Sequence, residues 1–266
     1  METTSFTQHK KTGKRNTLMT AITVTVLAIG LLNNRAHAQI KNIVLVHGAF
    51  ADGSGWEGVY KILKSKGYNV SVVGNPDTGM PDDVAATQRV LDRLDGPCIL
   101  VGHSYGGAII TEAGNSPKVA GLVYVAAFAP DAGETLGALL NSAPHDPVSG
   151  IMAPENGFVW YDKAKFHAGF CADLPKDQAD FLADSQVPVA AAAFGYVFKE
   201  PAWKTKPTWY IVSAEDHSIP PSLERTMGKR TGGKVSELKA SHLGFISHPK
   251  DVADVIEAAA KGAGSK

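Results

Sequence analysis

The sequence predicts an α/β fold in which about six mostly parallel strands form one sheet with helices on both faces. Two observations predict it. Short apolar runs alternate along the chain with segments whose apolar residues recur at helical spacing. The first run, 40–48, is a continuous apolar stretch that ends in glycine, as in a strand that is buried on both faces of a parallel sheet. Parallel neighbours need crossover connections, and the helices supply them.

The first 38 residues are predicted to be a secretory signal peptide. Four basic residues between Lys10 and Arg15 precede an apolar stretch, Met19 to Leu32, and Ala36-His37-Ala38 fits a cleavage site before Gln39. A retained membrane anchor is the alternative, but the apolar stretch holds three threonines and falls short of the roughly 20 apolar residues that a span needs. The mature protein is therefore expected to be exported, either periplasmic or secreted, with no membrane association after cleavage.

The predicted mature chain, 39–266, is long enough for one α/β domain. It keeps 21 Lys/Arg and 25 Asp/Glu, a mildly acidic balance that predicts neither a nucleic-acid partner nor an anionic membrane surface. Two cysteines, Cys98 and Cys171, are too few for a disulfide framework, although a bridge between them stays an alternative. Neither cysteine has metal-ligand spacing, and the oligomeric state is left open.

The elements follow one another in a regular order up to Pro130. The predicted strands are 40–48, 68–74, 97–102 and 119–127, and the helices between them are 55–67, 81–96 and 106–114. After an interruption, the pattern resumes with strand 208–216, helix 220–232, strand 234–240 and helix 249–262. The core is thus predicted over 39–130 and 204–266.

Residues 131–203 have no clean periodicity and are too many for an ordinary loop, so they are predicted to form a lid inserted into the sheet topology. Its aromatic residues predict an apolar or aromatic substrate pocket, with core packing as the equally weighted alternative. These aromatics are Phe158, Trp160, Tyr161, Phe166, Phe170, Phe194, Tyr196 and Phe198. Phe158 and Trp160 are the lid residues predicted to contact substrate.

The stretch Gly102-His103-Ser104-Tyr105-Gly106 is a G-x-S-x-G run between a predicted buried strand and a predicted helix. This context is typical of a nucleophile elbow, a tight turn that exposes the serine oxygen at the carboxyl end of a strand. The turn crowds the backbone, so its neighbouring positions must lack a Cβ. Ser104 is therefore the predicted nucleophile.

A serine hydroxyl needs a base to take its proton. His242 is the predicted base because it follows the last predicted strand and so reaches the same sheet edge as Ser104. The acid that orients the base should follow the preceding strand, where Glu215 and Asp216 are adjacent. Asp216 is the first choice and Glu215 the fallback.

A tetrahedral intermediate also needs two aligned donors for its oxyanion. The Tyr105 backbone N–H is predicted as one, and the loop after the first strand supplies the other, with Ala49 as first choice and Phe50 as second. His47 and His103 are predicted to hold loops or to line the mouth of the site. Gly48 is predicted to let the backbone approach a ligand closely.

The segments "LVHGAF", "VGHSYGG", "SAEDHSIPP" and "SHLGFISHP" together resemble the α/β-hydrolase superfamily over nearly the whole mature chain. They are most similar to its small single-domain esterases, the branch that includes plant hydroxynitrile lyases and methyl esterases. The resemblance implies a Ser104-His242-Asp216 triad, a lid between the sixth and seventh strands of the full family sheet, and a chain that starts at the third. The lyases carry a lysine after the triad histidine and a threonine in the first loop, where this chain has Leu243 and Gly48.

The expected function is hydrolysis of a carboxylic ester or lactone of an apolar or aromatic small molecule through an acyl-enzyme, with no metal or organic cofactor. Leu243 and Gly48 are included among the expected substrate contacts. Two alternatives use the same fold. One is different chemistry on the same triad, namely perhydrolysis or cleavage of a carbon–carbon or cyanohydrin bond. The other is a binding protein without catalysis.

Overall fold

The structure is a computed structural model that describes residues 1–8 and 39–265. The chain divides into two units, Met1–Ala38 and Gln39–Lys266. The leader predicted over the first unit lies largely outside the described residues. None of the helices in the described part of the chain has the length and apolar content that a bilayer crossing requires.

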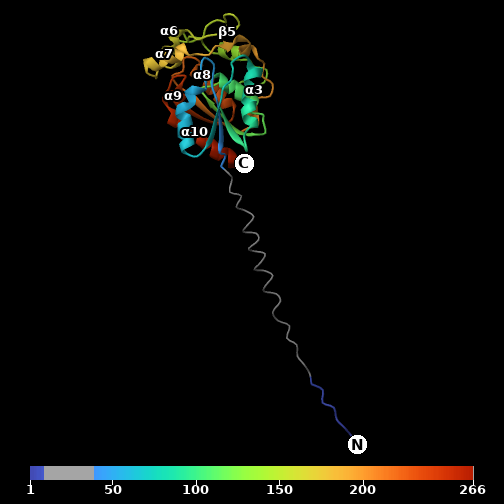
Figure 1. The fold of residues 1–266 in the computed structure, drawn as a ribbon. Helices are drawn as coiled ribbons and strands as arrows, with labels where there is room; N and C mark the ends of the chain where they lie inside the picture. The colour runs from blue at the N-terminus through green and yellow to red at the C-terminus, as the bar shows by residue number, and fades with distance from the viewer. Residues whose placement is uncertain (9–38, 266) are drawn as a thin grey trace. The chain divides into compact units, whose positions relative to one another are not determined.

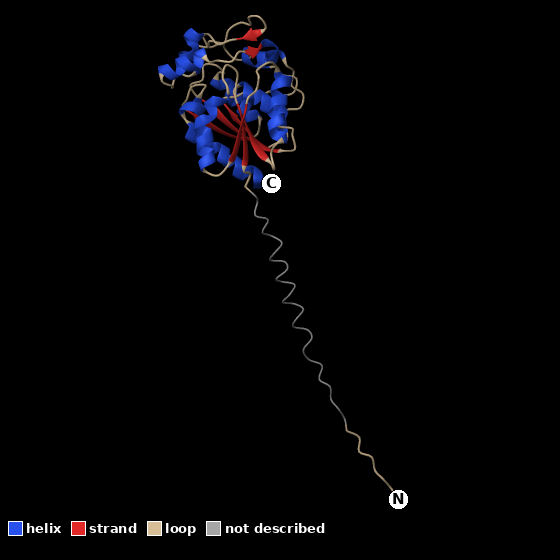
Figure 2. Ribbon diagram, viewed as in Figure 1, coloured by secondary structure: helices blue, strands red, loops and turns tan. Residues whose placement is uncertain are grey.

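The second unit is built on six parallel strands, which confirms the predicted fold class (Figure 2). The strands are β1 (Asn42–Val46), β2 (Asn69–Val73), β3 (Cys98–His103), β4 (Val119–Val125), β7 (Thr208–Ser213) and β8 (Lys234–Leu238). They lie in the order β2-β1-β3-β4-β7-β8. Strands β1 and β3 are buried at every position, as their continuous apolar sequences predict, whereas the edge strand β8 is mostly exposed.

Helices cover both faces of this sheet (Figure 1). Helices α2 and α10 pack against each other on one face, and α3 and α4 do so on the other. The helices of the core are η1 (Gly53–Trp56), α2 (Glu57–Ser65), α3 (Met80–Asp92), α4 (Tyr105–Ala113), α8 (Pro221–Arg230), α9 (Gly244–Ser247), α10 (Pro249–Gly262) and η4 (Ala263–Ser265). The sequence did not predict α9, a single turn that follows His242.

The segment 131–203, called the lid segment below, joins β4 to β7. Its elements are α5 (Leu136–Asn141), β5 (Phe158–Val159), α6 (Lys163–Phe170), α7 (Lys176–Asp184), β6 (Val189–Ala190) and η2 (Ala191–Gly195), and η3 (Ala202–Lys204) follows at its end. Strands β5 and β6 form a separate antiparallel pair. The short elements explain why the sequence showed no long period here.

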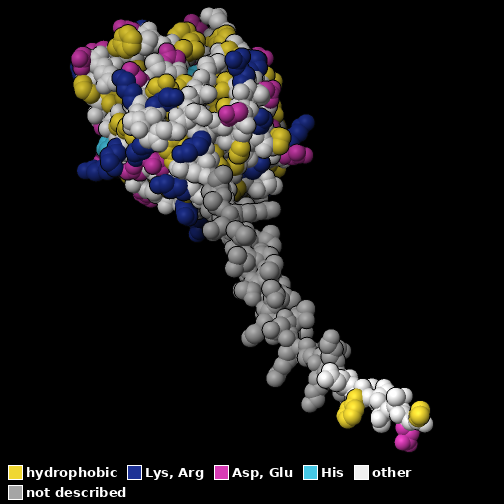
Figure 3. Space-filling view, turned by 60° about the horizontal axis from the view of Figure 1, so that its bottom comes forward, with side chains coloured by type: hydrophobic (Ala, Val, Ile, Leu, Met, Phe, Trp, Pro, Cys, Tyr) yellow, Lys and Arg dark blue, Asp and Glu magenta, His cyan; other side chains and the backbone are white. Residues whose placement is uncertain are grey.

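The surface charges and the two cysteines can be compared with the predicted charge balance and with the alternative disulfide. On the face seen in Figure 3, Lys/Arg and Asp/Glu side chains are interspersed, as a nearly balanced composition predicts. Cys98 and Cys171 are both buried and both free, so the structure does not contain the alternative disulfide. Burial raises the pKa of each thiol to about 12, which keeps both thiols protonated.

A buried carboxyl pair joins the loop after β2 to the start of α4. Asp77 and Asp83 are both fully buried, and Asp83 accepts hydrogen bonds from the Asp77 N–H at 2.8 Å and from the Tyr105 hydroxyl at 2.6 Å. Among the described residues, the Asp77 carboxyl group accepts only from the Asn75 amide, at 2.6 Å. Burial, followed by the charge of Asp83, raises the pKa of Asp77 to about 8. The pair therefore carries one proton at neutral pH, and Asp77 holds it.

Replacing Asp77 by Asn should change how stability depends on pH. The folded pKa of Asp77 lies above its unfolded value, so the native state binds the extra proton, and the free energy of unfolding falls as pH rises from about 4 to 8. An amide at this position would not ionise. We expect Asp77→Asn to gain about 1–3 kcal/mol relative to wild type between pH 5 and pH 8, measured by urea unfolding.

The matched control for this measurement is Asp177→Asn, which changes an exposed acid in the first turn of α7. Its unfolding free energy should follow the wild-type pH curve. An Asp77→Asn curve that also runs parallel to wild type between pH 5 and pH 8 would show that Asp77 is ionised in the folded protein.

Candidate active site

Ser104 occupies the turn between β3 and α4 with φ 53° and ψ −122°. Few residues other than glycine adopt a positive φ, and such strain persists only where the surrounding packing enforces it. Two glycines make that packing possible. A Cβ on Gly102 would lie 2.4 Å from the Gly106 carbonyl oxygen, and a Cβ on Gly106 would lie 2.5 Å from the His47 carbonyl oxygen. The glycines of the motif are therefore required by close backbone approach.

Ser104, His242 and Asp216 form one continuous hydrogen-bonded chain. The Ser104 Oγ lies 2.8 Å from His242 Nε2, and His242 Nδ1 lies 2.5 Å from Asp216 Oδ2. The three residues are 7%, 1% and 2% exposed, respectively. Because a carboxylate only accepts, the proton of neutral His242 sits on Nδ1, and Nε2 is free to accept from the serine hydroxyl.

Asp216 is fixed by its own turn. Its Oδ1 accepts the backbone N–H groups of Ser218 at 2.6 Å and Ile219 at 2.9 Å, while Oδ2 faces His242. Glu215, the fallback acid, has a half-exposed side chain that lies 3.7 Å from the Lys239 ammonium. Only Asp216 contacts the histidine, so the geometry favours the first choice.

Two other histidines near the site, His47 and His103, bond to backbone carbonyl groups and not to the serine oxygen. His103 donates from Nε2 to the His242 carbonyl at 3.0 Å, and its ring packs beside the His242 ring with a centroid separation of 4.8 Å. His47 donates from Nδ1 to the Gly48 carbonyl at 3.0 Å. Burial lowers the pKa of both rings, that of His103 strongly, so both stay neutral. This placement matches the loop-holding role predicted for them.

The oxyanion donors can be distinguished by their existing partners. The Phe50 N–H already donates to the Val187 carbonyl of the lid segment at 3.0 Å. The Ala49 N–H has no acceptor among the described residues, and the Tyr105 N–H is the first of α4, where no intrahelical partner exists. Ala49 and Tyr105 both line the cavity beside Ser104. The geometry therefore favours Ala49 over Phe50 as the second donor.

The cavity beside Ser104 measures about 20 Å³, room for roughly one water molecule. Its lining is almost wholly apolar and comes from the site loops and the lid segment. The lining residues are Ala49, Phe50, Ser104, Tyr105, Phe128, Leu136, Leu140, Ile151, Phe170, Phe194, Ser218, Ile219 and His242. Phe170 also packs on the His242 ring with a centroid separation of 4.9 Å. An acyl group entering this cavity would meet hydrocarbon on most sides.

The predicted substrate contacts lie elsewhere. Phe158 and Trp160 are 37% and 39% exposed and do not line this cavity. Leu243 lines a separate pocket with Phe245. Gly48 lies beneath the serine, where a Cβ would come within 2.7 Å of the Ser104 Cβ. Sequence reasoning did not select Leu136, Leu140 or Ile151, because the lid segment shows no periodicity that would orient its side chains.

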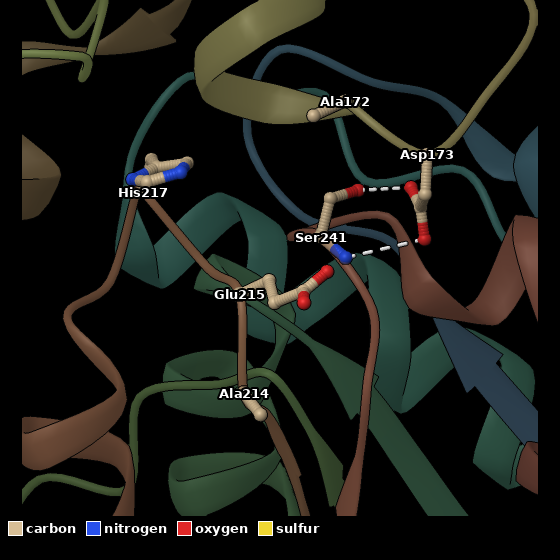
Figure 4. Close-up of a pocket in the computed structure, with 6 residues that line it drawn as sticks. All are labelled: Ala172, Asp173, Ala214, Glu215, His217 and Ser241. Carbon is tan, nitrogen blue, oxygen red and sulfur yellow. Dashed lines mark hydrogen bonds between the residues drawn. The ribbon is translucent and has the colours of Figure 1, made fainter.

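A larger cavity of about 590 Å³ opens on the other side of the His242 loop (Figure 4). Asp173 and Ser241 lie side by side in its lining, joined by hydrogen bonds, and Glu215 and His217 also line it. The Asp173 carboxylate accepts both the N–H and the hydroxyl of Ser241, the residue before His242. The lid segment therefore holds the histidine loop directly.

The same attachment is repeated on the other side of His242. The Leu243 N–H donates to the Phe170 carbonyl at 3.2 Å. The acid loop is held as well, because the Ser218 hydroxyl donates to the Gly169 carbonyl at 3.0 Å. The end of α6 thus contacts the loops that carry both the base and the acid.

Comparisons with known proteins agree with this geometry. A sequence model of the alpha/beta hydrolase family matches residues 43–255. The chain is 31% identical over 160 residues to the carbendazim hydrolyzing esterase of Nocardioides sp., a match that covers 54% of this chain and 64% of that esterase, less than two thirds of its length. It is 28% identical over 247 residues to the pyrethroid hydrolase of Sphingobium wenxiniae, covering 82% and 86% of the two chains.

Two further relatives bear on the branch and the fold. Methylesterase 8 of Arabidopsis thaliana is 24% identical over 216 residues, covering 70% of this chain and 76% of that protein. A crystal structure of a pyrethroid hydrolase from Sphingobium faniae aligns with a TM-score of 0.70 at 26% identity, covering 84% of this chain and 98% of that chain. The predicted resemblance to small esterases is confirmed. With its parallel six-stranded sheet and a family match over residues 43–255, the chain belongs to the alpha/beta hydrolase family.

Proposed function

We propose that this protein is a serine carboxylesterase that cleaves esters or lactones of apolar or aromatic small molecules. The observation that carries the proposal is the buried chain from Ser104 Oγ through His242 to Asp216, with separations of 2.8 and 2.5 Å. The names of the similar proteins, a carbendazim hydrolyzing esterase, a pyrethroid hydrolase and a methylesterase, support ester hydrolysis.

The first half of the reaction forms an acyl-enzyme. Ser104 Oγ attacks the ester carbonyl carbon while its proton passes to His242 Nε2, and Asp216 stabilises the resulting imidazolium. The carbonyl oxygen becomes an oxyanion, which the Ala49 and Tyr105 N–H groups bind. His242 then gives its proton to the leaving alkoxide, so the alcohol departs neutral and the acyl group stays on Ser104.

The second half restores the enzyme. His242 Nε2 takes a proton from water, the hydroxide attacks the acyl carbon, and the same two N–H groups bind the second oxyanion. The Ser104 oxygen leaves with the proton from His242, and the product acid is released. No metal or organic cofactor enters either half.

The substrate class follows from the lining of the cavity beside Ser104, which is apolar and includes Phe50, Phe128, Phe170 and Phe194. We propose that the lid segment shapes this pocket. An adjoining cavity of about 330 Å³ shares Leu140, Ile151 and Ser218 with it and supplies the route from solvent. Movement of these shared side chains would join the two spaces.

Replacing Ser104 by Ala should abolish turnover. In a series of p-nitrophenyl esters from acetate to long acyl chains, we expect wild type to be active and Ser104→Ala to lose at least ~10³-fold in kcat/KM, because the nucleophile is removed. The control is Ser65→Ala on the exposed end of α2. Absence of both turnover and fluorophosphonate labelling in wild type would instead support a binding protein without catalysis.

The choice of acid can be tested by two neutral substitutions at adjacent positions. Asp216→Asn should lower kcat by about 10³–10⁴-fold. The amide oxygen would keep accepting the Ser218 and Ile219 N–H groups, so the NH₂ group would face His242 Nδ1, donate to it and move the imidazole proton to Nε2. Glu215→Gln should stay within about 3-fold of wild type, since Glu215 contacts Lys239 rather than His242. The reverse order of effects would make Glu215 the acid.

We also propose that the protein is exported and that its leader is removed after Ala38, on the basis of the basic and apolar pattern in residues 10–38. N-terminal sequencing of protein expressed in bacteria with its own leader should give Gln39 as the first residue of the exported form. Recovery of an uncleaved chain in the membrane fraction would support the anchor alternative.

A further inference from the structure

Glu224 is a fully buried carboxyl group that the proposed reaction does not use. It lies in the first turn of α8, and its Oε2 accepts the Ser213 N–H at the end of β7 at 3.0 Å. Its Oε1 is buried and has no hydrogen-bond partner among the described residues if the group is taken as a carboxylate. A buried oxygen without a partner is costly, so its proton state needs an explanation.

The Glu224 carboxyl group has the triad acid, Asp216, as its hydrogen-bonding neighbour. The side chains of Glu224 and Asp216 lie within hydrogen-bonding reach of each other. Two carboxyl groups that contact each other at a buried site cannot both be ionised. Asp216 already accepts from Ser218, Ile219 and His242, which favours its charged form. The negative charge therefore resides on Asp216 and the proton on Glu224.

The other groups around Glu224 do not reverse this assignment. Tyr210 of β7 contributes a neutral hydroxyl, which donates to the Ala127 carbonyl. Arg225, the next residue of α8, is half-exposed and pairs with Glu237 at 2.8 Å on the surface. Burial, followed by the charge of Asp216, raises the pKa of Glu224 well above its ordinary value.

We propose that Glu224 is a positioning residue: its protonated Oε1 donates a hydrogen bond to the Asp216 carboxylate and fixes that carboxylate for His242. The inference rests on the proposed triad. It accounts for the unpartnered oxygen, because Oε1–H donates where a carboxylate oxygen would have nothing to accept. Glu224 also ties Asp216 to Ser213, so the acid is held both by the turn that follows it and by the strand that precedes it.

Two substitutions at Glu224 test whether its role depends on a hydrogen-bond donor. Glu224→Gln keeps the shape and an N–H donor and should leave the rate of fluorophosphonate labelling of Ser104 within about 3-fold of wild type. Glu224→Leu removes the donor and should lower that rate at least ~10-fold, because Asp216 loses a hydrogen bond to a charged group. Glu112→Gln on α4 serves as the matched control, since burial raises its pKa too but it contacts no triad residue.

The pH profile distinguishes a neutral from an ionised Glu224. Labelling requires neutral His242, so its acid limb reports the histidine pKa. If Glu224 is neutral, Glu224→Gln leaves the limb in place. If Glu224 were ionised, removing its charge would destabilise the imidazolium and move the limb to lower pH by about one unit. Such a shift would overturn the proposal.

A measurement on the wild-type protein tests the proposal even if the Glu224→Leu variant does not fold. Wild type at pH 7 should show infrared carbonyl absorption from protonated carboxylic acids. Glu224→Gln should remove the contribution of Glu224 and keep that of Asp77, whereas Asp77→Asn should remove only the contribution of Asp77. Absence of a Glu224 band overturns the proposal. So does a folded Glu224→Leu that labels at the wild-type rate.

The test also separates this inference from the proposed function. The downfield ¹H resonance of His242 Nδ1–H requires no substrate, and it should shift in Glu224→Leu but not in Glu224→Gln or Glu112→Gln. Wild type that hydrolyses no ester would count against the proposed function while this resonance still reports on Glu224. An unchanged resonance in Glu224→Leu would refute the positioning role even in an active esterase.

Discussion

The site depends on one buried negative charge, the carboxylate of Asp216. An ionised carboxylate away from water is costly unless donors surround it, and here two backbone N–H groups and the His242 ring supply them. The turn from Asp216 to Ile219 is shaped to aim those N–H groups inward. The same charge keeps the Nδ1 proton on His242, which leaves Nε2 free to accept the Ser104 proton. Glu224 extends this requirement into α8, because a second carboxyl group beside Asp216 must keep its proton.

The lid segment is as much a part of this arrangement as the sheet. Asp173 holds Ser241, and the Phe170 carbonyl holds Leu243, so both neighbours of His242 are bonded to the end of α6 or to the turn that follows it. The Val187 carbonyl accepts the Phe50 N–H, whereas the Ala49 N–H has no acceptor among the described residues. These bonds fix the histidine and help to define the oxyanion donors. A segment that looks like an insertion in the sequence therefore completes the geometry of the core.

The fold could be predicted because its signals are local. The central strands of the six-stranded sheet follow from apolar runs, and the elbow follows from glycines that only close backbone approach explains. Ser104, His242 and Asp216 could be selected because parallel strands bring their carboxyl ends to one edge. The residues that line the pocket could not be predicted from the sequence. Its walls come from short helices of the lid segment, whose facing depends on tertiary packing, so Phe158 and Trp160 were chosen where Leu136 and Ile151 line the cavity. The role inferred for Glu224 could not be predicted from the sequence either. An acid in the first turn of a helix is common, because it interacts favourably with the helix dipole.

The attachment of the lid segment also constrains how substrate reaches Ser104. The cavity of about 20 Å³ is too small for an ester, so something must move. Displacing α6 together with the turn that follows it would break the bonds to Ser241 and Leu243 and withdraw Phe170 from the His242 ring, and the base would lose its support as the substrate arrived. Rotation of Leu140 and Ile151, which border both this cavity and the adjoining space of about 330 Å³, breaks no side-chain hydrogen bond. Entry by side-chain movement at that boundary is therefore the path that keeps the triad intact.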